Sequence, residues 1–168
     1  SFEPGTREQG LFEENLKLNR MSTVRLIKAA VSNVRGTARL AVAEDGALNS
    51  LAVTDRRDQI IEQWQETPTI RLDDFLEEEG INDVDFVKID VEGAEWLVIQ
   101  GAQTLFSKPT PLTVLFEAYD PNAKGFGSNT ATVLEYFINL GYRLSYFGKN
   151  GELVPFSKVR PEFGTEYY

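Results

Sequence analysis

Blocks of apolar and polar residues follow one another along the chain in an order that predicts helices and strands in turn. A Thr-x-x-Gln capping box over Thr6 to Gln9 predicts that the first helix starts at Arg7. Later blocks have apolar residues at helical spacing, and short aliphatic or β-branched runs between them predict strands. The predicted helices span residues 7–19, 72–79, 94–106 and 129–140. The predicted strands span residues 24–31, 37–42, 86–89, 112–116, 142–147 and 152–156.

The stretch from Glu44 to Glu66 is polar and shows neither period, so it predicts an irregular connection anchored by Ile60, Ile61 and Trp64. Strands that alternate with helices predict an α/β fold, in which right-handed crossovers build a mostly parallel sheet with helices on both faces. Gly148-Lys149-Asn150-Gly151 lies between the last two strands and favours an antiparallel hairpin at the C-terminus. No repeat or linker divides residues 1–168, which predicts a single domain.

Composition excludes several classes of function. The net charge is −9, with 17 basic against 26 acidic residues and no basic cluster, which argues against a nucleic-acid partner. No apolar run approaches the roughly 20 residues that cross a bilayer, so no membrane partner is expected. The chain has no cysteine and no histidine, which excludes disulfides, thiol nucleophiles, Ser-His-Asp triads and Cys or His zinc sites. Absence of cysteine fits a reducing compartment, and we expect a cytoplasmic protein.

Polar residues follow the predicted strands at the points where the strands end. Glu3 follows "SF", Ser32 follows "LIKAAV", Asp90 and Glu92 follow "FVKI", and Glu117 follows "LTVLF". In open α/β sheets, ligands bind beyond the carboxyl ends of the parallel strands. The sequence therefore predicts a polar, mainly acidic site at this edge of the sheet.

Asp90 is the strongest candidate, because a carboxylate at the end of a central strand must be solvated, paired or bound to a ligand. Phe86, Lys88 and Asp90 share one face of the strand, so a pair between Lys88 and a neighbouring carboxylate is also consistent with the pattern. Other polar residues nearby have structural interpretations. Lys88 can extend along its stem to the rim, Glu95 can serve a helix N-terminus, and residues 120–122 (Asp-Pro-Asn) can form a turn.

Glu3 has a mechanism of its own. An acid at the tip of the second strand of a nucleotide-binding sheet can accept hydrogen bonds from both hydroxyls of a ribose. Its usual partner is a Gly-rich turn after the preceding strand, and this chain contains no such turn. The opening Ser1 to Pro4 reads as the end of a strand whose beginning is missing, so we expect an N-terminally incomplete domain.

Several motifs occur in one order from Phe2 to Phe156: "FEP", "NLKLN", "IRLDDFL", "DFVKIDVEGAEWLVIQGA", "VLFEAYD" and "LGYRL". Together they resemble the FkbM-type methyltransferase family, and "KIDVEGAE" followed by an apolar helix is the most specific part. The resemblance implies a Rossmann-like class I methyltransferase sheet with a terminal antiparallel hairpin, and S-adenosyl-L-methionine as cofactor. It implies O-methylation of a sugar or natural-product hydroxyl, with a small-molecule acceptor.

The resemblance also implies roles for residues. Glu3 would bind the ribose, Ser32 would lie near the adenine, and Asp90 would face the methionine part of the cofactor. Asp90, Glu92 and Glu117 are the candidate catalytic carboxylates, and no metal ligand is assigned. The family's first strand and Gly-rich loop would lie between the strands that end at Glu3 and Asp90, and this chain lacks them. A neighbouring chain could fill that gap, which leaves a homo-oligomer open.

Two other functions stay open from the residues. A nicotinamide-nucleotide oxidoreductase would explain Glu3 but gives no reason for "KIDVEGAE". A non-catalytic Rossmann-like module for binding or assembly would fit the incomplete start.

Overall fold

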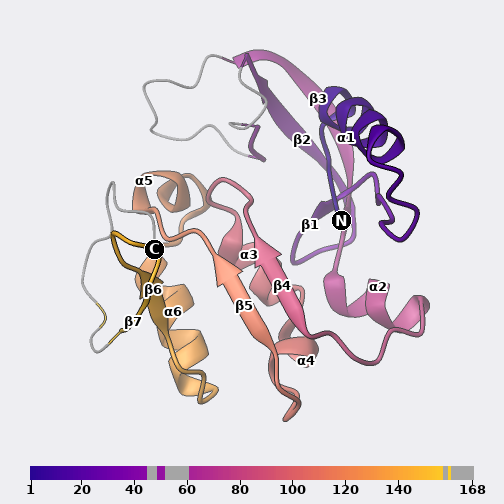
Figure 1. Ribbon diagram of the computed structural model, residues 1–168. Coiled ribbons are helices and arrows are strands. Elements are labelled where there is room, and N and C mark those ends of the chain that lie inside the picture. Colours follow the sequence, from indigo (N-terminus) through magenta and orange to yellow (C-terminus); the bar gives the residue numbers. More distant parts are fainter. Residues whose placement is uncertain (45–48, 52–60, 157–158, 160–168) are drawn as a thin grey trace.

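The computed structural model describes residues 1–44, 49–51, 61–156 and 159 (Figure 1). Its helices are α1 (Thr6–Leu18), α2 (Leu72–Glu78), α3 (Glu95–Gln100), α4 (Gln103–Phe106), α5 (Asp120–Ala123) and α6 (Thr130–Asn139), with a 3₁₀ turn η2 (Lys124–Phe126). Its strands are β1 (Ala30–Val31), β2 (Gly36–Ala43), β3 (Ile61–Ile70), β4 (Phe86–Ile89), β5 (Thr113–Phe116), β6 (Ser145–Phe147) and β7 (Leu153–Pro155). No helix in these ranges is long and apolar enough to cross a membrane.

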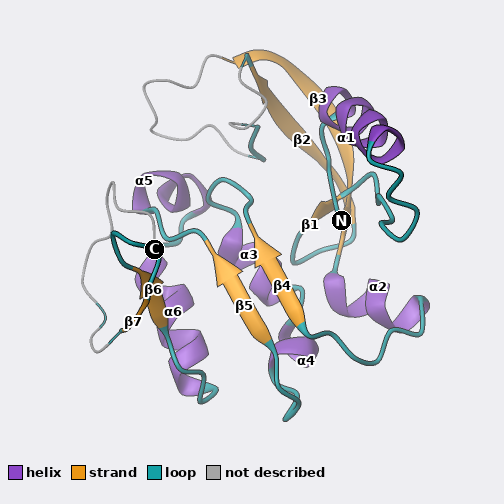
Figure 2. Ribbon diagram, viewed as in Figure 1, coloured by secondary structure: helices purple, strands orange, loops and turns teal. Residues whose placement is uncertain are grey.

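The described strands form three small sheets, ordered β1-β3-β2, β4-β5 and β6-β7. Figure 2 shows β4 and β5 at the centre, with the β6-β7 hairpin and α6 on one side and the β1-β3-β2 sheet on the other. The pairs β1-β3 and β4-β5 are parallel, whereas β2-β3 and β6-β7 are antiparallel. The mixed α/β class and the C-terminal hairpin are therefore confirmed, while the expected continuous, mostly parallel sheet is not what these strands form.

Two strand predictions need correction. The predicted strand over residues 24–31 is reduced to β1. The part before β1 pairs with the short N-terminal segment, through a hydrogen bond from Ser1 to the Arg25 carbonyl and an isolated parallel bridge between Phe2 and Ile27. The predicted irregular stretch from Glu44 to Glu66 contains the first half of β3. The sequence did not reveal that strand, because Trp64 is exposed, whereas the inward-facing side chains of Gln65, Thr67 and Thr69 are polar. Residues 45–48 and 52–60 of that stretch lie outside the described residues.

The first helix is confirmed, but its predicted capping box is wrong. No side chain caps α1, and Gly5 stands at the N-cap position. The Gln9 side-chain amide donates instead to the carbonyls of Glu3 and Pro4, at 2.9 and 3.2 Å. Gln9 therefore fixes the N-terminal segment against α1, next to Glu3.

The predicted helix over residues 94–106 is two helices, α3 and α4, separated at Gly101 and Ala102. The Asp73 carboxylate of α2 accepts hydrogen bonds from the backbone N–H groups of Thr104 and Leu105, at 2.9 and 3.0 Å. These amides would be bonded within a continuous helix, so Asp73 supplies a new helix start at this point. A side chain at Gly101 would collide with the Ser32 carbonyl, so the break also brings α3 close to the end of β1.

The hydrophobic core lies between the β4-β5 pair and the helices that cover it. It is built from Leu72, Ile89, Val98, Ile99, Ala102, Leu105, Phe106, Val133 and Phe137. Phe137 of α6 is 1% exposed, and its ring packs against Phe106 and Phe116 with centroid separations of 5.3 and 5.5 Å. This packing holds α4 and α6 against β5, and the parallel pairing of β5 with β4 fixes the loops that follow both strands.

A groove of about 770 Å³ separates the N-terminal segment from β4. Its lining includes apolar residues of the core and of its margin, among them Phe2, Phe75, Leu76, Val98 and Leu105. Glu3 and Asp90 also line the groove. β4 has β5 on one edge, and no described strand pairs with the edge that faces this groove.

Candidate functional site

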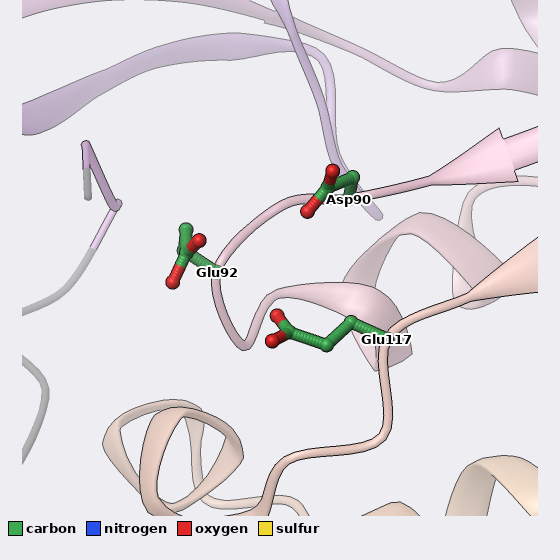
Figure 3. Close-up of side chains that lie close together, drawn as sticks. All are labelled: Asp90, Glu92 and Glu117. Carbon is green, nitrogen blue, oxygen red and sulfur yellow. The ribbon is translucent and has the colours of Figure 1, made fainter. Parts of the chain in front are cut away.

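Three carboxylates predicted from the sequence come together beyond the ends of β4 and β5. Asp90 and Glu92 lie in the loop after β4, and Glu117 follows β5 directly. One carboxylate oxygen from each lies within 4.8 Å of the others (Figure 3). The parallel register of β4 and β5, from Phe86 opposite Thr113 to Ile89 opposite Phe116, brings the two strand ends to the same edge.

Asp90 is exposed and forms an ion pair. The Lys88 ammonium lies 2.7 Å from Asp90 Oδ2, and the two side chains are 58% and 51% exposed. The pair confirms that Lys88 and Asp90 share a face of the strand. Lys88 therefore partly neutralises the negative charge of Asp90.

Glu92 is held by residues from two other parts of the chain. The Ser50 hydroxyl donates to the Glu92 carbonyl at 3.1 Å. The Asn122 side-chain amide donates to Glu92 Oε2 at 2.7 Å. Both Ser50 and Asn122 are buried, with 1% and 0% of their surface exposed.

Glu95 is buried beside the same loop. Its carboxylate Oε1 accepts a hydrogen bond of 3.2 Å from the Gly93 N–H. Burial raises the pKa of Glu95 to about 7, hydrogen bonds from the loop backbone oppose the shift, and the nearby Glu117 carboxylate adds to it. From the sequence, Glu95 was interpreted as an acid that stabilises the N-terminus of a helix. In the structure it does begin α3, but it is also buried beside the three carboxylates, where its raised pKa lies near neutral pH.

Glu3 lies across a cavity from Asp90 and Glu92. It is half-buried, and its Oε1 accepts a hydrogen bond of 2.8 Å from the Gly5 N–H. Burial raises the pKa of Glu3, against the opposing effect of the Gly5 hydrogen bond. The cavity has a volume of about 290 Å³, and its lining includes Glu3, Ser50, Asp90 and Glu92.

A second cavity, of about 310 Å³, borders the same loop. Its polar lining consists of Lys88, Asp90, Glu92 and Glu117. Asp90 and Glu92 therefore border both cavities, Glu3 borders only the first of these two, and Glu117 only the second. This arrangement suits a reaction between two ligands that meet at the loop after β4.

Ser32 lies apart from this group. It is 5% exposed at the end of β1, where its backbone N–H donates to the Ile70 carbonyl at 2.8 Å. Its hydroxyl lies 3.4 Å from Asn33 Oδ1, and it lines neither the 290 Å³ nor the 310 Å³ cavity. The cofactor role assigned to Ser32 from the sequence stays a prediction.

Sequence reasoning missed Ser50 and Asn122. Ser50 lies next to a polar stretch without a period, and residues 120–122 were interpreted as a turn, whereas they begin α5. No local signal marks either residue, since each meets Glu92 only through the fold.

The three carboxylates offer only oxygen atoms as ligands. Such atoms suit hard cations such as Mg²⁺ or Ca²⁺. The same groups also suit an organic cation, or the removal of a proton from a hydroxyl. The three carboxylates therefore do not by themselves indicate a metal site, and the sequence analysis assigned no metal ligand.

The family model described as "Methyltransferase FkbM domain" matches residues 1–144. The chain belongs to the FkbM methyltransferase family. The matched range contains Glu3, Asp90, Glu92 and Glu117, so all four carboxylates of the site lie inside the FkbM domain. Comparison with curated proteins finds no match to this chain, and comparison with solved structures finds none either.

Proposed function

We propose that this FkbM-domain protein is an S-adenosyl-L-methionine-dependent methyltransferase that methylates a hydroxyl group of a sugar or natural-product small molecule. The observation that carries the proposal is the convergence of Asp90, Glu92 and Glu117 at the edge of two cavities, in a chain of the FkbM methyltransferase family. The β4-β5 pair, connected through α3 and α4, would be the part of a Rossmann-like sheet that carries this edge.

The residues around the 290 Å³ cavity fit an adenosyl cofactor. Glu3 lies on one side of the cavity with a half-buried carboxylate, which suits the two hydroxyls of a ribose. Asp90 and Glu92 lie on the other side, where negative charge suits a sulfonium cation. Ser32 would lie toward the adenine. When bound, the cofactor supplies a methyl group on a sulfonium, ready for transfer to an oxygen nucleophile.

The chain's own contribution is to bind, to orient and to accept a proton. The acceptor would occupy the 310 Å³ cavity, with its hydroxyl facing the Asp90, Glu92 and Glu117 carboxylates. One of these groups takes the hydroxyl proton as the new carbon–oxygen bond forms, so the products are a methyl ether and the demethylated cofactor. Placing the hydroxyl in line with the methyl group supplies the rest of the acceleration.

A small-molecule acceptor fits the charge of the chain. The net charge of −9 opposes binding to the phosphates of a nucleic acid. The acceptor we expect is neutral or cationic, because the cavity that would take it is lined by three carboxylates and a single lysine.

The proposal is tested by incubating the protein with S-adenosylmethionine labelled in its methyl group and a panel of sugars and hydroxylated natural products. We expect transfer of label to at least one acceptor, and a loss of at least a hundredfold in rate for Asp90→Asn. The exposed Asp83 in the loop before β4 gives the matched control Asp83→Asn, which should keep the full rate. Equal rates for Asp90→Asn and the wild type would remove Asp90 from catalysis.

A further inference from the structure

Glu92 has a backbone conformation that its own residue type does not favour. Its φ angle is 51°, in the left-handed region where side chains other than those of glycine, asparagine and aspartate are rare. Such a conformation persists only where the surroundings hold it, and it concentrates at functional sites. Contacts with neighbouring residues must therefore stabilise the left-handed backbone conformation of Glu92.

Asn122 is the neighbour that holds the Glu92 side chain. Its amide donates to Glu92 Oε2 at 2.7 Å from a side chain that is 0% exposed. Among the described residues nothing bonds Asn122 Oδ1, which is itself buried. A buried amide with an unsatisfied oxygen is unfavourable, and packing alone would favour an apolar residue at this position. The hydrogen bond to Glu92 explains why an asparagine occupies this buried position.

Gly93 and Ser50 hold the backbone around the same contact. Gly93 has φ 100°, and a Cβ atom there would collide with the Asn122 carbonyl group, so the loop and α5 meet backbone to backbone. The Ser50 hydroxyl donates to the Glu92 carbonyl at 3.1 Å. The Glu92 backbone is fixed by Ser50 and its carboxylate by Asn122.

We propose that Asn122 is a positioning residue that holds the Glu92 carboxylate at the junction of the two cavities. Glu92 borders both cavities and lies within 4.8 Å of Asp90 and Glu117. Fixing one of its oxygens on Asn122 sets the plane of the carboxylate and limits the directions in which it can face a ligand. The effect of Asn122 on cofactor binding rests on the proposed function, whereas its effect on Glu92 does not.

The test is a double-mutant cycle read by calorimetric titration with S-adenosylmethionine. Asn122→Leu keeps the approximate volume of the side chain and removes the amide. It should weaken binding about tenfold, as expected for losing one hydrogen bond to a charged group. The same substitution in a Glu92→Met protein should weaken binding less than twofold further, because the oxygen to which Asn122 donates is already absent there. Equal losses in both backgrounds overturn the inference.

A second readout needs no cofactor. The ¹³C resonance of the Glu92 carboxyl carbon should move in Asn122→Leu and stay in place in Asn82→Leu, which alters an exposed Asn in the loop before β4. If the wild type binds no S-adenosylmethionine, the proposed function fails, and an unmoved Glu92 resonance then overturns the positioning role separately.

If Asn122→Leu does not fold, the reversed pair Asn122→Asp with Glu92→Gln replaces it. That pair restores the hydrogen bond with donor and acceptor exchanged, so it should unfold at a higher temperature than Asn122→Asp alone. An unfolding temperature no higher than that of the single variant contradicts the contact.

Discussion

The Lys88 ammonium lies 2.7 Å from Asp90 Oδ2, so the carboxylate at the tip of β4 carries its own counter-charge. Both side chains are about half exposed, and an exposed pair of this kind contributes little to stability, about 0–1 kcal/mol. Its consequence for function is larger, because Lys88 lines the cavity that we assign to the acceptor and pairs with Asp90, which also borders the cavity that we assign to the cationic cofactor.

Removing that positive charge should improve cofactor binding. We expect Lys88→Met to tighten S-adenosylmethionine binding by roughly twofold to fivefold, because Asp90 then faces the sulfonium without a competing cation. Lys108→Met is the control, since Lys108 bonds the Asn82 carbonyl in the loop before β4. Weaker binding by Lys88→Met would contradict the placement of the sulfonium near Asp90.

The buried Glu95 should make stability depend on pH. Its pKa is about 7 in the folded chain against 4.5 as the reference value, so the folded state keeps a proton that the unfolded state releases between these values. Glu95 therefore contributes stability in full below about pH 4.5, and that contribution is lost as the pH rises through about 7. The loss is on the order of 3 kcal/mol at about 1.4 kcal/mol per pKa unit.

Urea unfolding of the wild type and of Glu95→Gln at pH 5 and pH 8 measures this effect. The free energy of unfolding should fall more between the two pH values in the wild type than in Glu95→Gln. Glu135→Gln, on the exposed face of α6, should behave as the wild type. Equal falls in Glu95→Gln and the wild type would show that Glu95 is already ionised at pH 5.

Gly93→Ala should destabilise the protein strongly. The new Cβ would collide with the Asn122 carbonyl group, and the residue would keep a φ angle of 100°. Overpacking and backbone strain together predict a loss of roughly 2–4 kcal/mol in the free energy of unfolding. Gly10→Ala is the matched control, because Gly10 lies inside α1 with nothing within 4 Å of its added Cβ. That variant should gain roughly 0.5–1 kcal/mol, and a similar small change in Gly93→Ala would contradict the close approach of α5.

Amide hydrogen exchange should reveal the edge of β4 that faces the groove. The Asp85 and Ile89 carbonyls accept hydrogen bonds from Thr113 and Glu117, so the alternate residues Phe86 and Lys88 direct their main-chain groups toward the other edge. We expect the Lys88 amide to exchange at least tenfold faster than the Ile89 amide. Equal protection at both positions would mean that another strand covers that edge.

Much of the fold follows from local patterns in the sequence. β4 was predicted with its observed bounds, Phe86–Ile89, and α2, α6 and the hairpin were predicted within a few residues. β3 was not, because its inward positions include Thr67 and Thr69 rather than apolar residues. The break between α3 and α4 was missed as well, since it depends on Asp73, about thirty residues earlier in the chain.

Some residues of the candidate site could likewise be predicted from the sequence, and others could not. Asp90, Glu92 and Glu117 follow strands, so the rule that ligands bind beyond strand ends was enough to find them. Ser50 and Asn122 reach Glu92 only through tertiary contacts, and the depth at which Glu95 is buried depends on how α3 packs. No local pattern encodes those distances.

The central claim is that the cavity between Glu3 and the loop after β4 binds S-adenosylmethionine. Calorimetric titration of the wild type, Glu3→Ala and Glu14→Ala with this cofactor tests it directly, because Glu14 lies exposed on α1 and serves as the control. We predict binding by the wild type and by Glu14→Ala with equal affinity, and at least tenfold weaker binding by Glu3→Ala, which loses its hydrogen bonds to the ribose. No binding by the wild type, or equal affinity in all three proteins, would contradict the account.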